Sequence, residues 1–401
     1  MIHIFMNALA ASAGGGLTYV RNVVPHLAAR DDVRATVVAD AGLRQEFGAW
    51  PRVQFQAARV GTGVAARFWF EQTQMPSVIR ESGADVLLSA GNFALWNSPV
   101  PQILLSRNAL YTSPDFMADL RRRGDYRLWL DTELKAAAAK SSIQHADVTV
   151  APSAAFARDL REWTGKDVVA IHHGFDAAAF SSDPGPLPPH IEAKLAGAAD
   201  ALRILFVSHY NYYRNFETLI RALPLLRDRM APRKMCLMLT CELRSEANPG
   251  AYQAQSAGAL VQELGVENNV IELGTVPYRL LHRLYRGCDV YVTAAYAESF
   301  AHPLVEAMWS EVPVVAADIP VHREICGDSA IYFPRFSPAL LAEAVGRLAD
   351  SAEARADSTR KGAIRVRKFS WQDHVSELVR LAGRLSSARR KIVSRCDSAA
   401  V

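Results

Sequence analysis

The sequence predicts an α/β protein made of two doubly wound domains, each a parallel sheet covered by helices on both faces. The first observation is length, because 401 residues are too many for one ordinary hydrophobic core. The second is that short apolar runs alternate with helical stretches in two separate series. The third is a stretch rich in proline, glycine and serine between the two series, SSDPGPLPPH, which is typical of a linker.

The first series predicts an N-terminal Rossmann-like domain over residues 1–180. It begins with IHIFMNA, a strand pattern, which is followed by a glycine-rich turn and by the amphipathic run LTYVRNVVPHLAA. The further predicted strands are RATVVAD, DVLLSAG, PQILLSR, DVTVAPS and VVAIHHG.

The second series predicts another Rossmann-like domain over residues 181–370. LRILFVS leads into the helical FETLIRALPLLRD, and the remaining predicted strands are KMCLMLT, NVIELGT, DVYVTAA and VPVVAAD. Residues 371–401 have helical composition and a basic end. In open α/β sheets, ligands bind beyond the carboxyl ends of the strands, so we expect the site in a cleft between the two domains.

Composition narrows the class of protein. The net charge of +4 fits an anionic small ligand or a membrane surface, whereas scattered basic residues without a recognition motif argue against nucleic acid. The five cysteines form no CxxC pair, which argues against a disulfide framework and a zinc site. The N-terminus lacks the pattern of a signal peptide, and no run approaches the roughly 20 apolar residues of a membrane span. We therefore predict a cytoplasmic protein.

The stretch AESFAHPLVEAMW places Glu298 just before a predicted helix and Glu306 inside it. Pro303 suits the first helical turn, so backbone N–H groups just before it should face outward and favour an anion. The residues that carry these groups are Ser299, Phe300 and Ala301. Two carboxylates beside an anion site suit the neutral hydroxyls that flank the phosphates of a nucleoside diphosphate sugar. The alternative is that Glu306 stabilises the helix dipole, by about 0.3–1 kcal/mol, and that Glu298 is solvated.

ESFAHPLVEAM followed by VPVVAAD resembles the E-x7-E signature of family 4 glycosyltransferases. ADVTVAPSAAFARDL, IHHGFD and SHYNYYRNFETLI occur in the usual order of that family, so the resemblance covers nearly the whole chain. It implies the GT-B fold, with two Rossmann-like domains facing a central cleft and the helix of 371–401 packing back on the N-terminal domain. It also implies transfer of a hexose with retention of configuration, from a UDP- or GDP-linked sugar, with no cofactor and no metal.

The resemblance assigns residues after the first strand of the second domain. Relatives carry G-R-x4-K there, and the matching positions are Ser208, His209 and Arg214. Arg214 would hold the diphosphate, because its planar fork suits phosphate oxygens, and His209 would be a second donor. The alternative is a solvent-facing arginine and a core histidine. In LGTVPYRLLHRLY, the backbone around Val276 would meet the nucleobase.

The glycine loop of the first domain contains Gly15 and Gly16, which the resemblance places opposite the donor phosphates and the acceptor. The alternative is a plain tight turn. A dinucleotide-binding loop would need a third glycine where Tyr19 stands, so a dehydrogenase is a weaker alternative, although Asp40 ends the second predicted strand.

Asn108, beside Arg107, stands where relatives often have a histidine. It could contact the transferred sugar or position the acceptor, but an amide cannot act as a general base.

Four arginines near Trp129 could form a basic face for an anionic membrane, or a solvated helix face. They are Arg121, Arg122, Arg123 and Arg127. The expected partners are a nucleotide sugar, a saccharide or lipid-linked acceptor, and, on the first of these alternatives, the inner face of a membrane. Two rival functions share the predicted fold: a sugar-nucleotide 2-epimerase and a catalytically inactive scaffold.

Overall fold

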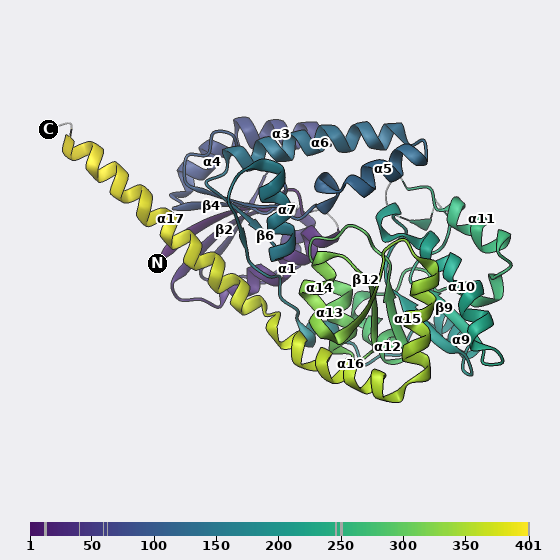
Figure 1. Cartoon of the computed structure of the whole chain (residues 1–401). Helices are drawn as coiled ribbons and strands as arrows, with labels where there is room; N and C mark the ends of the chain where they lie inside the picture. The colour runs from purple at the N-terminus through teal and green to yellow at the C-terminus, as the bar shows by residue number, and fades with distance from the viewer. Residues whose placement is uncertain are drawn as a thin grey trace. The chain divides into compact units, whose positions relative to one another are not determined.

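The chain forms two compact units in a computed structural model (Figure 1). The structure describes residues 1–11, 14–39, 41–58, 60–61, 63–244, 247–248 and 252–399. Unit 1 comprises Met1–Thr112, Asp131–Gly174 and Ser370–Val401. Unit 2 comprises Ser113–Leu130 and Phe175–Phe369.

Unit 1 is built on a seven-stranded sheet with the order β3-β2-β1-β4-β5-β6-β7, in which neighbouring strands are parallel. The strands are short and their apolar residues are buried, as expected where helices cover both faces. Their bounds are β1 Ile2–Asn7, β2 Val33–Ala39, β3 Val53–Ala57, β4 Val86–Ser89, β5 Gln102–Leu105, β6 Val148–Ala151 and β7 Val168–Ala170.

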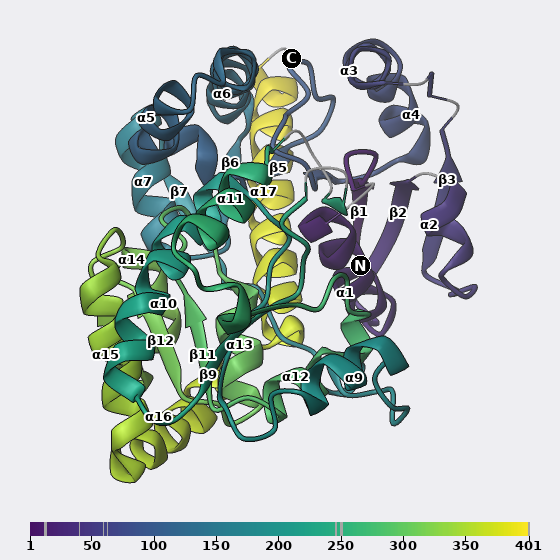
Figure 2. The same cartoon turned by 90° about the vertical axis from the view of Figure 1, so that its right-hand side faces the viewer.

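The helices of unit 1 include the C-terminal helix α17, Trp371–Ala399, which contacts α1, β1 and β4. Trp371, Val375 and Leu378 are buried in the same core cluster as the strands. Figure 2 shows α17 running beside the sheet of this unit. The other helices are α1 Gly14–Ala28, α2 Ala41–Gln45, α3 Val64–Thr73, α4 Met75–Ser82, the 3₁₀ turn η1 Ala109–Thr112, α6 Tyr126–His145, which begins in unit 2, and α7 Ala154–Thr164.

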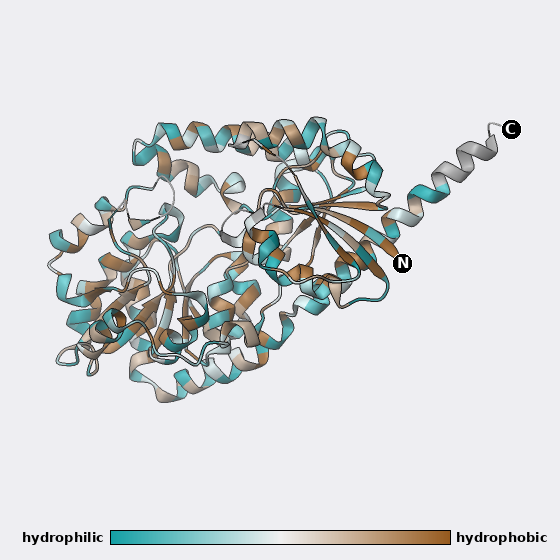
Figure 3. Cartoon of the chain, turned by 180° about the vertical axis from the view of Figure 1, so that it is seen from behind, coloured by the Kyte–Doolittle hydropathy of each residue, from teal (hydrophilic) through white to brown (hydrophobic). Residues whose placement is uncertain are grey.

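Unit 2 has a six-stranded parallel sheet with the order β10-β9-β8-β11-β12-β13. Every residue of β9, β11 and β12 is buried. Figure 3 shows that strands of the chain carry mainly hydrophobic residues. The strands are β8 Leu202–Phe206, β9 Met235–Leu239, β10 Val270–Glu272, β11 Val290–Thr293, β12 Val314–Ala317 and β13 Ala330–Phe333.

The helices of unit 2 flank this sheet. They are α5 Pro114–Arg122, α8 Ala177–Phe180, α9 Pro189–Ala196, α10 Phe216–Met230, α11 Gln255–Glu263, α12 Leu281–Arg286, α13 His302–Trp309, α14 Pro320–Cys326, α15 Pro338–Asp350 and α16 Ala352–Arg365. Short 3₁₀ turns are η2 Tyr212–Arg214, η4 Glu267–Asn269, η5 Tyr278–Leu280, η6 Gly327–Ser329 and η7 Val366–Lys368.

Each sheet has one point where the strand order reverses. In unit 1 it lies between β1 and β4, and in unit 2 between β8 and β11. Loops leave the carboxyl ends of such strand pairs in opposite directions, which opens the crevice where ligands bind in this class of fold. The loops that follow these four strands are therefore the first places to look for a site.

The division of the chain differs from the predicted boundaries at two places. The chain passes from unit 1 to unit 2 after Gly174 rather than at residue 180, so the predicted linker at 181–190 lies inside unit 2. Residues 113–130 also group with unit 2, although the prediction placed them in the N-terminal domain. The reason is that side chains of 113–130 contact unit 2: Asp119, for example, accepts a hydrogen bond from the hydroxyl of Tyr296 at 2.9 Å. Within the described part of the chain, no helix is both long and apolar enough to cross a bilayer.

Candidate functional site

The loop that follows β8 is fixed by Asn215, which has a left-handed backbone conformation with φ 57°. Asparagine tolerates this conformation better than most residues. Its side-chain Nδ2 donates to the carbonyl of Ala294, at 3.1 Å, and to that of Arg335, at 2.6 Å. Because Ala294 follows β11, Asn215 ties together the two loops at the switch point of unit 2.

Arg214 and Glu298 meet between these two loops. Arg214 Nη1 donates to a carboxylate oxygen of Glu298, and their side chains are only 18% and 10% exposed. A second link joins the loops, because the backbone N–H of Tyr296 donates to the carbonyl of Tyr213 at 3.0 Å. The structure therefore brings together two of the predicted site residues. The alternative that Glu298 is solvated is wrong.

Arg214 keeps spare hydrogen-bonding capacity in this pair. Its Nε is buried and has no partner among the described residues. Burial raises the pKa of Glu298, and the Arg214 guanidinium opposes that rise. A buried guanidinium with a free donor, held by one carboxylate, can accept a further anion without losing its support.

Glu306 lies in the second turn of α13 and is 5% exposed. The hydroxyl of Tyr285 donates to its Oε2 at 2.9 Å. Burial raises the pKa of Glu306 to about 7, and the hydrogen bond from Tyr285 opposes the rise. A helix dipole acts mainly within the first turn, so this position does not favour the dipole alternative.

The start of α13 has an unusual backbone. Ala301, the residue before the helix, has φ 66° and ψ 60°, and its side chain makes no cap. Phe300 is 2% exposed, and its ring packs against Phe369 with a centroid distance of 5.4 Å. The buried ring of Phe300 therefore holds the loop between β11 and α13 in place. Contact of Ser299, Phe300 and Ala301 with an anion stays a prediction.

The other residues predicted in unit 2 lie at strand ends too. Ser208 follows β8, and its N–H donates to Thr240 Oγ1 at 2.9 Å. The side chain of His209 is exposed, so the alternative of a core histidine is wrong. Val276 follows β10 and is 8% exposed. Nucleotide contacts of these three residues stay predictions.

In unit 1, Gly15 and Gly16 lie in the first turn of α1, so the expectation of a loop or a tight turn at these glycines is wrong. Arg107 contacts this turn: its Nη1 donates to the carbonyl of Gly15 at 3.0 Å, and its Nη2 donates to the carbonyl of Ala90, the residue after β4. A Cβ at Gly16 would lie 3.2 Å from the Cα of Ala11, a tight contact, whereas one at Gly15 would meet nothing within 4 Å. The first turn of α1 is therefore closely packed at Gly16 and open at Gly15.

Asn108 has a local structural partner. Its Oδ1 accepts the N–H of Leu110 at 3.1 Å, which caps the turn η1. Its contact with a sugar or an acceptor stays a prediction.

The position where a dinucleotide-binding loop would need its third glycine is occupied by a buried side chain, that of Tyr19. Tyr19 is 1% exposed, and its hydroxyl is 2.9 Å from Nε2 of His374 in α17. A dinucleotide-binding loop needs glycine at this position so that helix and strand can pack closely. Asp40 lies outside the described residues.

The predicted basic face is smaller than expected. Arg123 pairs with Glu217 at 2.8 Å and with Asp119 at 3.1 Å, and its side chain is 21% exposed. Arg121, Arg122 and Arg127 are exposed. Membrane contact through these three residues stays a prediction.

Sequence reasoning missed three residues that support the site: Asn215, Tyr285 and Asp119. Asn215 carried a signal, since asparagine directly before a helix favours a left-handed turn. Tyr285 and Asp119 carried none, because their partners Glu306 and Tyr296 are distant in the sequence.

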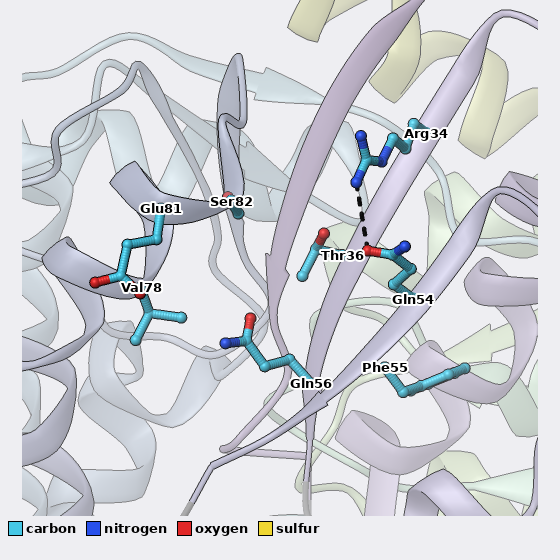
Figure 4. Close-up of a pocket in the computed structure, with 8 residues that line it drawn as sticks. All are labelled: Arg34, Thr36, Gln54, Phe55, Gln56, Val78, Glu81 and Ser82. Carbon is cyan, nitrogen blue, oxygen red and sulfur yellow. Dashed lines mark hydrogen bonds between the residues drawn. The ribbon is translucent and has the colours of Figure 1, made fainter.

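A polar hollow of about 530 Å³ opens elsewhere in unit 1, along β2, β3 and α4 (Figure 4). Its lining residues are Arg34, Thr36, Gln54, Phe55, Gln56, Val78, Glu81 and Ser82. It runs along β2 from Arg34 to Thr36 and along β3 from Gln54 to Gln56. Its lining contains none of the predicted site residues, so this hollow is separate from the candidate site.

Family models match both parts of the chain. Residues 13–179 match the model described as Glycosyltransferase Family 4, and residues 190–365 match Glycosyl transferases group 1. The chain is 26% identical over 256 residues to a D-inositol 3-phosphate glycosyltransferase of Corynebacterium aurimucosum. That match covers 62% of this chain and 59% of the relative, so the chain spans less than two thirds of the relative's length.

Two solved structures share the fold. Sucrose-phosphate synthase from Thermosynechococcus elongatus has a TM-score of 0.74 and 18% identity, covering 97% of this chain and all of that one. HepE from Anabaena, in complex with UDP-glucose, has a TM-score of 0.69 and 17% identity, covering 96% of this chain and all of that one. The two parallel sheets and these neighbours show that the chain has the GT-B fold. The matches to the two family models show that it belongs to glycosyltransferase family 4.

Proposed function

We propose that the chain is a retaining glycosyltransferase that moves a hexose from a UDP-linked sugar to an acceptor hydroxyl. The observation that carries this proposal is the buried Arg214–Glu298 pair between the loops after β8 and β11. The fold of HepE is similar, and its solved structure is a complex with UDP-glucose. UDP is therefore the first donor nucleotide to test, with GDP as the alternative.

In the proposed reaction, the acceptor oxygen bonds to the anomeric carbon of the sugar. The bond from that carbon to the diphosphate oxygen breaks, and the acceptor's proton passes to the departing phosphate. Arg214 stabilises the charge that grows on the diphosphate. Glu298 orients Arg214 and accepts a hydrogen bond from a hexose hydroxyl, while Glu306 accepts hydrogen bonds from the ribose. No carboxylate base is needed on the acceptor side.

The first test is binding. Thermal unfolding is measured with UDP, GDP, and their glucose and mannose conjugates, because a ligand that binds only the folded state raises the melting temperature. Turnover is then measured with the best donor. The acceptor panel includes saccharides, lipid-linked saccharides and inositol phosphate, the last because the Corynebacterium relative is a D-inositol 3-phosphate glycosyltransferase.

The second test is the variant Arg214→Ala. We expect kcat to fall about a hundredfold or more, because preorganised donors to a developing anion contribute roughly 2.7–4 kcal/mol each. The matched control is Arg323→Ala, which removes an exposed arginine paired with Asp318 in the same unit. Near-normal turnover of Arg214→Ala would remove its proposed role.

The two rival functions give different products. A sugar-nucleotide 2-epimerase would isomerise the donor when no acceptor is present, whereas a transferase would leave the donor intact or hydrolyse it slowly. An inactive scaffold would bind a nucleotide and change no donor. Chromatography of the donor after incubation alone, and then with the acceptor panel, separates the three.

A further inference from the structure

The segment Ser113–Leu130 belongs to unit 2, although it lies in the sequence between two parts of unit 1. Its helix α5 begins at a well-formed cap, where Ser113 Oγ accepts the N–H of Phe116 at 3.2 Å. Phe116 and Leu120 are buried, at 1% and 0% exposure. The helix is therefore a packed part of unit 2.

One contact of α5 reaches the loop that carries Glu298. The hydroxyl of Tyr296 donates to Asp119 Oδ2 at 2.9 Å, and the two residues are 177 positions apart. Tyr296 is 7% exposed and stands two residues before Glu298. A buried hydrogen bond to a carboxylate is one of the stronger kinds.

Other contacts reach the loop that carries Arg214. The ring of Phe116 packs edge-on against Tyr213, with centroids 6.2 Å apart. The guanidinium of Arg123 lies 4.2 Å from the ring centroid of Tyr212, and its Nη1 is 2.8 Å from Glu217 in the first turn of α10. Tyr212 and Tyr213 are the first two residues of η2, which ends in Arg214, and Glu217 follows three residues later.

Asp119 joins the two sets of contacts. Its Oδ2 accepts from Tyr296 and also from Nε of Arg123, at 3.1 Å. We propose that Asp119 is a positioning residue, which sets the separation of the two loops so that Arg214 meets Glu298. The proposal rests on the function proposed above, because that function gives the Arg214–Glu298 pair its role in binding the donor.

The competing explanation is that Asp119 only stabilises the fold. A double-mutant cycle separates the two, because residues that act through one another have non-additive effects. Tyr296→Phe removes only the hydroxyl that binds Asp119. The matched control is Tyr332→Phe, which removes a hydroxyl bonded to the carbonyl of Gly327, away from both loops.

Each substitution is made in the wild-type chain and in Arg214→Ala, and the Kd of UDP or GDP, whichever binds the wild type more tightly, is measured by calorimetry. We expect Tyr296→Phe to raise the Kd about tenfold in the wild type and less than about twofold in Arg214→Ala. Tyr332→Phe should change the Kd less than about twofold in either background. Melting temperatures of all variants show whether each remains folded.

An equal loss in both backgrounds, or no loss in the wild type while Arg214→Ala binds weakly, would overturn the positioning role and leave the proposed function standing. An unchanged Kd in Arg214→Ala itself would remove the role of Arg214 in binding the donor, and the positioning role of Asp119 with it, whereas the proposed function is overturned only by the absence of transfer from any donor. If Tyr296→Phe does not fold, Asp119→Asn supplies the same cycle, because it keeps the side-chain size and loses the charge that Arg123 needs.

Discussion

At the scale of single residues, Glu306 is the group whose chemistry is most changed by its surroundings. Its carboxyl is buried beside the hydroxyl of Tyr285, and burial raises its pKa to about 7 from an ordinary value of 4.5. Near neutral pH the protein without ligand is therefore a mixture of the protonated and ionised forms. The ionised form accepts hydrogen bonds from two ribose hydroxyls more strongly than the protonated form, in which one oxygen carries the proton.

The pKa of Glu306 predicts a pH-dependent affinity for the donor. Because the ionised form binds the ribose more tightly, the Kd should rise as the pH falls below about 7, by at most about tenfold for each unit of decrease. Calorimetry with UDP-glucose at several pH values checks this, because UDP-glucose lacks the terminal phosphate that titrates near pH 6 in UDP. Glu306→Gln should bind more weakly and show a flat profile; a wild-type profile that is equally flat would contradict the ribose contact.

The same shift affects stability with the opposite sign. A carboxyl whose pKa is raised by folding stabilises the folded protein below its unfolded value of 4.5, and this contribution is lost as the pH rises through about 7. Glu306→Gln should therefore gain stability relative to the wild type between pH 5 and 8. This gain separates lost ribose contacts from simple misfolding of the variant.

The sequence predicted that Arg214, Glu298 and Glu306 serve one site, but not how their side chains meet. The motif places Glu298 and Arg214 at the ends of adjacent strands, which is a matter of topology. Their pairing depends on two loop residues with positive φ, Asn215 at 57° and Ala301 at 66°. No periodicity reveals such dihedrals, and the partner of Glu306, Tyr285, comes from another helix.

At the scale of elements, α13 ends in a Schellman motif with an unfavourable residue. The N–H of Val312 donates to the carbonyl of Ala307 at 3.0 Å, and the N–H of Glu311 donates to that of Met308 at 3.2 Å. Glu311 occupies the left-handed position with φ 59°. Glycine is usual there, because a Cβ in this conformation costs roughly 1–2 kcal/mol.

Glu311→Gly should therefore stabilise the protein by about 1 kcal/mol and raise the melting temperature of unit 2 by about 2–4 °C. Glu311 is exposed, so little packing is lost. The control is Glu311→Ala, which removes the carboxylate but keeps the Cβ and should give no gain. Equal stabilisation by both variants would assign the effect to charge rather than to backbone strain.

Elements were easier to predict than their assignment to a core. Strands such as KMCLMLT and VPVVAAD are buried as expected. The stretch 113–130 has helical composition, but composition does not reveal which core a helix joins. Its membership of unit 2 depends on contacts such as Asp119 with Tyr296, between residues far apart in the chain.

At the scale of the whole molecule, the chain passes between the units four times, and two of these crossings lie together. On the side of unit 2, the N–H of Phe175 donates to the carbonyl of Phe369 at 3.1 Å. On the side of unit 1, Gly174 packs directly against the backbone of Ser370 and Trp371. The start of α17 is thus packed against Gly174, the residue at which the chain passes from unit 1 to unit 2. The next residue after Ser370, Trp371, is buried in the core of unit 1.

This packing predicts that Gly174→Ala destabilises unit 1. A methyl group at Gly174 would overlap the backbone of Ser370 and Trp371, which cannot move as a flexible side chain would. We expect a loss of about 1–3 kcal/mol or more, measured by denaturant unfolding. The control is Gly383→Ala in α17, where an added Cβ meets nothing within 4 Å and should stabilise the helix by about 1 kcal/mol. Unchanged stability in Gly174→Ala would show that the two crossings are not packed together in solution, and α17 would then need another anchor on unit 1.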